Sequence, residues 1–166
     1  MEIKMVLDLP RDAVSVPVSR QVLDSCLETL GVTPDTRADI ALALSEACAN
    51  VVQHAGPGDE YEVQARARNG QCAIEVVNTS GRDGTPKPDG SGEGDGIALT
   101  GDPVPPTAES GRGLTIINAV VDNLQLTGSK GAGTIVHFEK TLEWLPGAAG
   151  QHLLSASGGT KTRPGR

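Results

Sequence analysis

The sequence predicts one α+β domain, a two-layer sandwich in which an antiparallel or mixed sheet is covered on one face by three helices. Strand-like and helix-like segments follow one another in the order strand, helix, helix, hairpin, long loop, helix, hairpin. The 166 residues, 37% of them hydrophobic, can bury one core of ordinary size but do not suggest two full domains. With one Trp, one Tyr and one Phe, that core must consist of Val, Leu, Ile and Ala.

The first strand and the first helix are marked by their ends. Residues 3–9 are rich in branched side chains and predict a strand that Pro10 closes. Ser15 and Pro17 offer the chemistry of a helix start, and apolar residues then recur at spacings of three and four. Gly31 supplies the stop for this helix.

A second helix and a hairpin follow. Thr33-Pro34 opens the helix, which runs to about Ala55, where a Gly-Pro-Gly sequence ends it. Apolar and polar side chains alternate over residues 61–68 and again over residues 72–76. Asn69-Gly70 between them is a hairpin turn pair, so these two strands are expected to be antiparallel.

A long loop separates the hairpin from the rest of the fold. Glycine, proline and acidic residues dominate residues 81–110, and a structureless loop of that length in a compact domain is usually functional or disordered. We interpret it as a mobile lid. A short helix over residues 114–121 and a last hairpin, in which residues 124–127 pair with residues 134–141, complete the fold.

Composition and charge limit the domain and its partners. We expect residues 1–145 to form the domain and residues 146–166 to be a flexible tail. The N-terminus has no apolar stretch long enough for a signal peptide or membrane span, which predicts a cytoplasmic protein without a membrane partner. The formal net charge of −7 repels phosphate backbones and argues against nucleic acid.

Several enzyme classes lack their motifs in this chain. Cys26, Cys48 and Cys72 are odd in number and widely spaced, so they predict buried thiols rather than disulfides or a metal site. No GxxxxGK[ST] or GxGxxG spacing occurs, which excludes a P-loop enzyme and a Rossmann dehydrogenase. The three histidines fall on a helix, a strand and the tail and support no hydrolase.

A polar stripe runs beside the apolar stripe of the second helix. Glu46, Asn50 and His54 recur at intervals of four and therefore share one helix face. A stripe of this kind is more often solvated surface than a site, and spacing alone favours that interpretation. The rest of the chain changes the balance.

Three segments resemble the motifs of one superfamily. ALSEACANVVQHA resembles the N-box of the GHKL (Bergerat-fold) ATPases, in the variant of the bacterial anti-sigma-factor serine kinases. SGRGLTIINAVVDNLQL and GAGTIVHFEKTL are similar to the second glycine box and the closing hairpin. The resemblance spans about residues 3–142 and implies the Bergerat fold, with ATP and Mg²⁺ as cofactors.

The resemblance gives roles to the polar stripe. Asn50 matches the residue that coordinates Mg²⁺, and a carbonyl oxygen suits a hard cation already bound by triphosphate. Glu46 matches the carboxylate that accepts the proton of the attacking serine hydroxyl in the kinase branch. His54 occupies a cofactor-side position often filled by His, and a capping or packing role is as consistent as a chemical one.

The second glycine box is implied to hold phosphate. Ser110-Gly111-Arg112-Gly113 is expected to precede a helix that begins at Leu114, whose free amides and positive dipole end suit an anion. The resemblance places the nucleotide beside Gly111, Arg112, Gly113 and Leu114. Arg112 either pairs with phosphate or faces solvent. Thr134 matches a residue near the adenine.

The first glycine box departs from the family pattern. Asp-x-Gly-x-Gly is replaced by a stretch in which Asn78 takes the place of the Asp and Gly81 follows. Asn78 has the strand parity of Ile74 and Val76, so it should point inward. Its side-chain oxygen is still an acceptor for the adenine amino group, but without the charge that strengthens such a bond.

The resemblance implies a serine/threonine protein kinase that phosphorylates a STAS-type anti-anti-sigma partner, sequesters a sigma factor and forms a homodimer. The alternative is a non-catalytic partner-switching module of the same fold with a degenerate nucleotide site. Glu46 and Asn50 favour the kinase, and Asn78 favours the module. A detached histidine-kinase catalytic domain is less favoured, because no phosphoacceptor helix precedes residue 3.

Overall fold

A computed structural model describes residues 1–54, 60–78, 109–129 and 133–155. These residues form a five-stranded sheet in the order β1-β2-β3-β5-β4, in which each neighbouring pair is antiparallel. The strands are β1 (Glu2–Pro10), β2 (Glu60–Arg68), β3 (Gln71–Asn78), β4 (Asn123–Ser129) and β5 (Gly133–Thr141). The helices are α1 (Ser15–Leu30), α2 (Pro34–His54), α3 (Glu109–Val120) and α4 (Ala149–Ser155).

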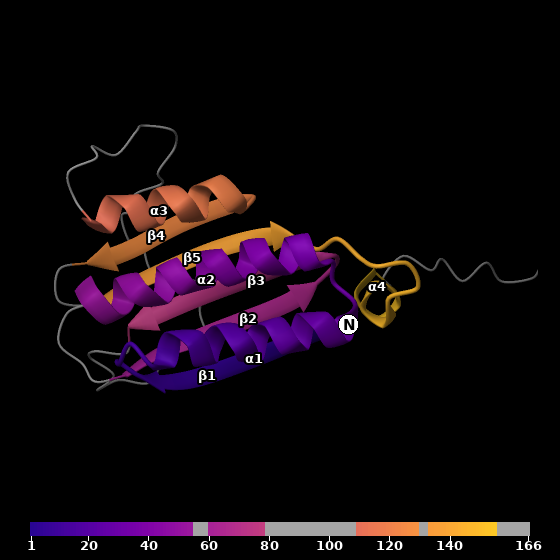
Figure 1. The fold of residues 1–166 in the computed structure, drawn as a ribbon, viewed down its shortest axis with the longest axis horizontal. Helices are drawn as coiled ribbons and strands as arrows, with labels where there is room; N and C mark the ends of the chain where they lie inside the picture. Colours follow the sequence, from indigo (N-terminus) through magenta and orange to yellow (C-terminus); the bar gives the residue numbers. More distant parts are fainter. Residues whose placement is uncertain (55–59, 79–108, 130–132, 156–166) are drawn as a thin grey trace, which may run out of the picture.

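The helices α1, α2 and α3 lie side by side on one face of the sheet (Figure 1). The opposite face of the sheet carries polar side chains such as Gln64, Arg66 and Glu75, which alternate along the strands with the buried residues. None of the described helices covers this face. The predicted two-layer α+β sandwich is therefore confirmed, and its sheet is antiparallel throughout. Among the helices in the described ranges, none is long and apolar enough to cross a membrane.

The start of α1 differs in its chemistry from the prediction. The helix does begin at Ser15, but the Ser15 hydroxyl is buried and hydrogen-bonds to the Tyr61 hydroxyl at 2.7 Å. Asp12 closes the preceding turn instead, because its carboxylate accepts the N–H of Val14 at 2.9 Å. The predicted stop is confirmed, since Gly31 ends the helix in the left-handed region at φ 83°.

The first hairpin forms as its turn residues predict. Asn69 and Gly70 have φ values of 51° and 76°, and a two-residue type I′ hairpin turn requires positive φ at both of these positions. The turn sets the register in which Ala67 pairs with Cys72 and Tyr61 pairs with Asn78. The last residue of β3 therefore lies beside the start of β2.

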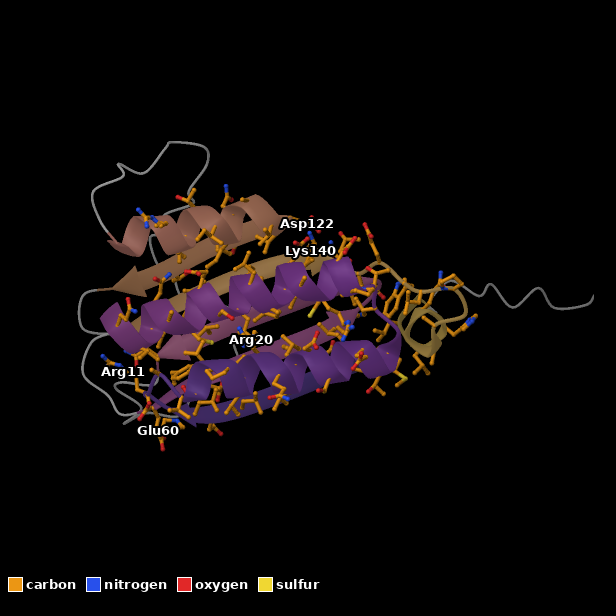
Figure 2. The ribbon with its side chains drawn as sticks, in the orientation of Figure 1. Arg11, Arg20, Glu60, Asp122 and Lys140 are labelled. Carbon is orange, nitrogen blue, oxygen red and sulfur yellow. The ribbon has the colours of Figure 1, made fainter. Side chains whose placement is uncertain are left out.

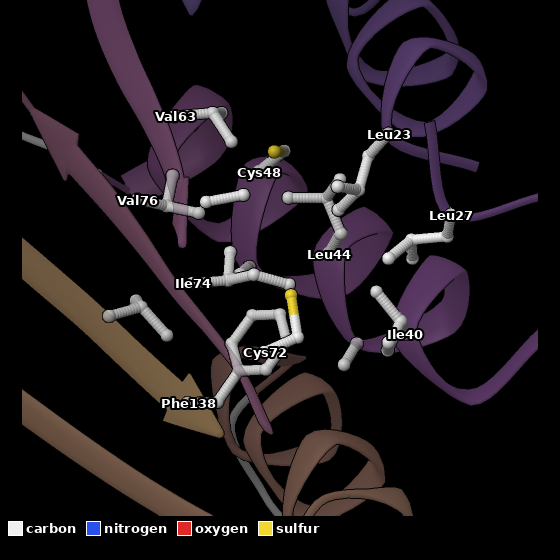
Figure 3. Close-up of a cluster of buried hydrophobic side chains, with 14 of the residues drawn as sticks. Leu23, Leu27, Ile40, Leu44, Cys48, Val63, Cys72, Ile74, Val76 and Phe138 are labelled. Carbon is white, nitrogen blue, oxygen red and sulfur yellow. The ribbon is translucent and has the colours of Figure 1, made fainter. Parts of the chain in front are cut away.

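The core fills the space between the helices and the inner face of the sheet. Figure 3 shows Leu44 and Cys48 of α2 in one cluster with Cys72 of β3 and Phe138 of β5, and all four side chains are at most 1% exposed. Burying each large apolar side chain contributes about 1.5–3 kcal/mol. The expectation of buried thiols holds for Cys48 and Cys72 but is wrong for Cys26, which is exposed.

Helix α3 begins earlier than the sequence predicts. The glycine box was expected to be a loop ending at Gly113, whereas the helix already includes Glu109 and the whole box. The predicted loop over residues 81–110 is therefore wrong at its last two residues. The physical reason is that glycine lowers helix propensity by only about 1 kcal/mol, which contacts between α3 and α2 outweigh. Residues 79–108 lie outside the described residues.

The C-terminal segment is also ordered further than predicted. A flexible tail from Pro146 is contradicted by α4, whose Leu154 is 1% exposed. The segment before α4 is tied to the connection between α1 and α2, because the Leu145 N–H donates to the Gly31 carbonyl at 2.8 Å. A Cβ at Gly31 would lie 2.6 Å from the Ala148 Cβ, so glycine also permits this close packing. Residues 156–166 lie outside the described residues.

Candidate functional site

The candidate site lies where the second half of α2 meets the first turns of α3. Glu46 and Asn50 are four residues apart on α2, so they share one face, and both are partly buried. A Cβ at Gly113 of α3 would lie 3.0 Å from Glu46 Oε2 and 3.3 Å from Asn50 Oδ1. The fold thus brings together residues from two motifs that are more than 60 positions apart in the chain.

Glycine at position 113 allows this close approach. Cβ atoms rarely come within 3.0–3.4 Å of other heavy atoms, so a larger residue would displace the Glu46 carboxylate or move α3 away from α2. The first N–H groups of α3 have no acceptor within the helix, and they lie at the positive end of its dipole. These free amides suit an anion, and they lie in the turn just before Gly113, which contacts the polar stripe of α2.

Asn78 and Thr134 lie at one end of the sheet. Asn78 is the last residue of β3 and is 4% exposed, which confirms that it points inward. Val77 of β3 pairs with Ile135 of β5, and the two strands are antiparallel. Thr134, which precedes Ile135, therefore lies at the same end of the sheet as Asn78, which follows Val77. The two strands thus place the candidate adenine residues close to each other.

Tyr61 supports this end of the sheet, a role that the sequence analysis did not assign to it. It pairs with Asn78 across the β2–β3 ladder and is fully buried. The Ser15 hydroxyl donates to the Asp12 carbonyl at 2.6 Å, so the Tyr61 hydroxyl donates to Ser15 Oγ. Burial raises the pKa of Tyr61 to about 12, which keeps the hydroxyl protonated. The one available signal was a tyrosine at an inward strand position.

The other predicted site residues fall in different surroundings. His54 is the last residue of α2, and Gly111 lies in the first turn of α3. Arg112 is exposed on α3, whereas Leu114 is partly buried and packs against the core. Gly81 lies outside the described residues.

The chemistry of these groups fits a nucleotide with its cation. Within the described part of the chain, neither the Glu46 carboxylate nor the Asn50 amide makes a side-chain hydrogen bond, although both lie beside Gly113. Carboxylate and amide oxygens are the ligands that hard cations such as Mg²⁺ prefer. Glycine at position 113 lets the backbone of α3 come close to both groups. Asn50 and the start of α3 are thus the groups that would hold Mg²⁺ and the phosphates.

The family description that fits this geometry is the histidine kinase-like ATPase domain, which matches residues 9–140. The chain belongs to this family. The resemblance to the GHKL anti-sigma-factor kinases, first seen in the N-box and the second glycine box, is thereby confirmed.

Among known proteins, the chain is similar to two proteins named serine-protein kinase RsbW. The one from Bacillus cereus (strain G9842) is 28% identical over 131 residues, which cover 77% of this chain and 79% of the relative. The one from Bacillus mycoides (strain KBAB4) is 27% identical over 132 residues, with the same coverage.

A solved structure supports the fold. The crystal structure of the RsbU and RsbW domains of Rv1364c from Mycobacterium tuberculosis matches with a TM-score of 0.59 at 20% identity. The match covers 84% of this chain but 32% of that chain, so the present chain corresponds to about a third of the larger protein.

Proposed function

We propose that this chain is an ATP-dependent serine/threonine protein kinase that phosphorylates an anti-anti-sigma partner and sequesters a sigma factor. The observation that carries the proposal is the position of Glu46 and Asn50 beside Gly113 at the start of α3. The relatives named serine-protein kinase RsbW support the same activity.

Each of these residues has a distinct role in the proposed reaction. Glu46 accepts the proton of the substrate hydroxyl, because its carboxylate lies one helical turn from the metal-binding amide of Asn50. The amides at the start of α3 stabilise negative charge on phosphate oxygens. When bound, ATP would supply the γ-phosphoryl group, and Mg²⁺ held by Asn50 would neutralise part of its charge.

The first experiment measures nucleotide binding by calorimetry, with and without Mg²⁺. We expect Mg²⁺-dependent binding by the wild type, at least about tenfold weaker binding by Asn50→Ala, and no change for Asn118→Ala, an exposed control on α3. Asn78→Asp should bind more tightly, because a charged acceptor strengthens the bond to the adenine amino group. Absence of binding by the wild type would contradict the kinase proposal.

A second experiment tests the proton acceptor. Glu46→Gln and Glu46→Ala should reduce phosphate transfer to a STAS-type partner about 10²-fold or more, while both variants keep their nucleotide affinity. Transfer is measured with radiolabelled ATP in single turnover. Loss of nucleotide binding together with transfer would assign Glu46 to binding instead of proton transfer.

A second candidate function is a non-catalytic partner-switching module, which the neutral Asn78 favours. For the module, ATP would change neither the affinity for the sigma factor nor the affinity for the anti-anti-sigma partner. For the kinase, ATP would change which of the two partners is bound. For either function we propose a homodimer acting in the cytoplasm, and analytical ultracentrifugation with each partner tests the assembly.

A further inference from the structure

Lys140 connects three elements at the end of the helix layer opposite the candidate site. It extends from β5, and its ammonium group donates to Asp39 Oδ2 of α2 at 2.8 Å and to the Val120 carbonyl at 2.7 Å. Val120 is the last residue of α3, where the carbonyl groups lack helical partners and the dipole is negative. The Lys140 side chain is 18% exposed, so this contact is largely shielded from water.

The spacing of contacts along the two helices is the same. Asp39 and Glu46 are seven residues apart on α2, and Gly113 and Val120 are seven residues apart on α3. Seven helical residues rise about 10.5 Å, so the contact through Lys140 and the contact at Gly113 are compatible in one antiparallel alignment. A slip of α3 by one turn would break both contacts together.

The turn after α3 is fastened to the same strand. The Asp122 N–H donates to the Glu139 carbonyl at 2.9 Å, and the Asp122 carboxylate accepts the Thr141 N–H at 2.5 Å. Figure 2 shows Asp122 and Lys140 close together at this end of α3. Strand β5 therefore holds the C-terminal end of α3, whereas the heavy atoms nearest to a Cβ at Gly113 belong to Glu46 and Asn50 of α2.

We propose that Lys140 is a positioning residue for the nucleotide site: by fixing α3 along α2, it holds the start of α3 against Glu46 and Asn50. This inference rests on the proposed function for its effect on ATP. Its effect on the start of α3 does not require a nucleotide. The Lys140 ammonium binds Asp39 and Val120, each about two helical turns from the residues of the site, so it acts through the position of α3.

A matched control is available between the other two helices. Arg37 of α2 pairs with Asp24 and Glu28 of α1 at 3.2 Å, and its side chain is 16% exposed, close to the value for Lys140. Arg37→Met therefore removes a similarly shielded cation from the same helix layer without loosening α3. Lys140→Met keeps the apolar stem of the side chain and removes the charge.

The experiment measures amide hydrogen exchange of residues 113–115 in the nucleotide-free protein, and then the affinity for Mg²⁺ and ATP. We expect Lys140→Met to speed the exchange of these amides about tenfold and to lower the affinity for ATP about tenfold. Arg37→Met should leave the exchange rate and the affinity unchanged. If Lys140→Met does not fold, Lys140→Gln, which is neutral and shorter, should show the same changes in the same direction.

Two outcomes separate this inference from the proposed function. Wild-type exchange at residues 113–115 and wild-type ATP affinity in both Lys140 variants would overturn the positioning role, even if global stability falls. Equal changes in Arg37→Met would overturn it too, because they would reflect lost stability alone. No ATP binding by the wild type would defeat the proposed function, while the exchange measurement would still test the alignment of α3.

Discussion

At the Lys140 end of the α2–α3 pair the ammonium group has two acceptors, whereas at the Gly113 end the Glu46 and Asn50 side chains make no hydrogen bond to the described residues. The first arrangement stabilises the fold, because partly buried polar groups are satisfied. The second leaves a carboxylate and an amide available beside a helix start. The difference separates the polar groups that stabilise the helix layer from the two that we propose act on the nucleotide.

The largest effect is expected from adding a side chain at Gly113, where α3 approaches Glu46. Gly113→Ala places a Cβ 3.0 Å from Glu46 Oε2 and should weaken Mg²⁺ and ATP binding about a hundredfold, or about 2.7 kcal/mol. The free energy of unfolding should not fall, because alanine is favoured over glycine inside helices by about 1 kcal/mol. Calorimetry and chemical denaturation measure the two quantities. Unchanged affinity would show that the close approach does not matter for the ligand.

A smaller effect is expected from removing the Tyr61 hydroxyl, which is hydrogen-bonded to Ser15 at the start of α1. Tyr61→Phe removes the hydroxyl that bonds to Ser15, and we expect a loss of about 1–1.5 kcal/mol of stability in urea unfolding. Ser15 keeps its bond to the Asp12 carbonyl, so no buried donor is left without an acceptor. A loss of ATP affinity beyond threefold would instead place Tyr61 in the site, through its strand partner Asn78.

At the anchored end, charge should matter less than geometry. Asp39→Asn keeps an oxygen acceptor for Lys140 but removes the ion pair, and Asp39 is 39% exposed. We therefore expect a loss of about 0.5–1 kcal/mol in thermal unfolding. Hydrogen exchange at Gly113 should stay close to that of the wild type. Strongly faster exchange there would mean that the charge itself holds α3 in place.

The smallest effect concerns pH. Hydrogen bonding from the Thr141 side chain, and then from its backbone N–H, holds the pKa of the Asp122 carboxyl below its usual value, so the folded state favours the carboxylate. Its stabilising contribution is complete above about pH 4 and is lost as the pH falls through the lower folded value. Asp122→Asn should flatten the acid side of the unfolding curve below pH 4. A variant with the wild-type pH dependence would assign that slope to other carboxylates.

The sequence predicted the fold where local rules decide it. The alternation over residues 61–68 and the Asn69-Gly70 turn specified a hairpin, and the structure has the expected positive φ values there. It also predicted Glu46 and Asn50 as neighbours, because four-residue spacing on a helix places them on one face. The prediction failed at α4, whose buried Leu154 sits in a segment of loop-like composition.

By itself the sequence determined the order of strands and helices from β1 to β5, the Asn69-Gly70 turn, and the polar stripe of α2, since each depends on residues a few positions apart. Only the tertiary structure decided that Gly113 meets this stripe and that Lys140 anchors α3. The bonds of Lys140 join residues 101 and 20 positions apart in the chain. Contacts of that range depend on how the helices pack on the sheet, which no local pattern specifies.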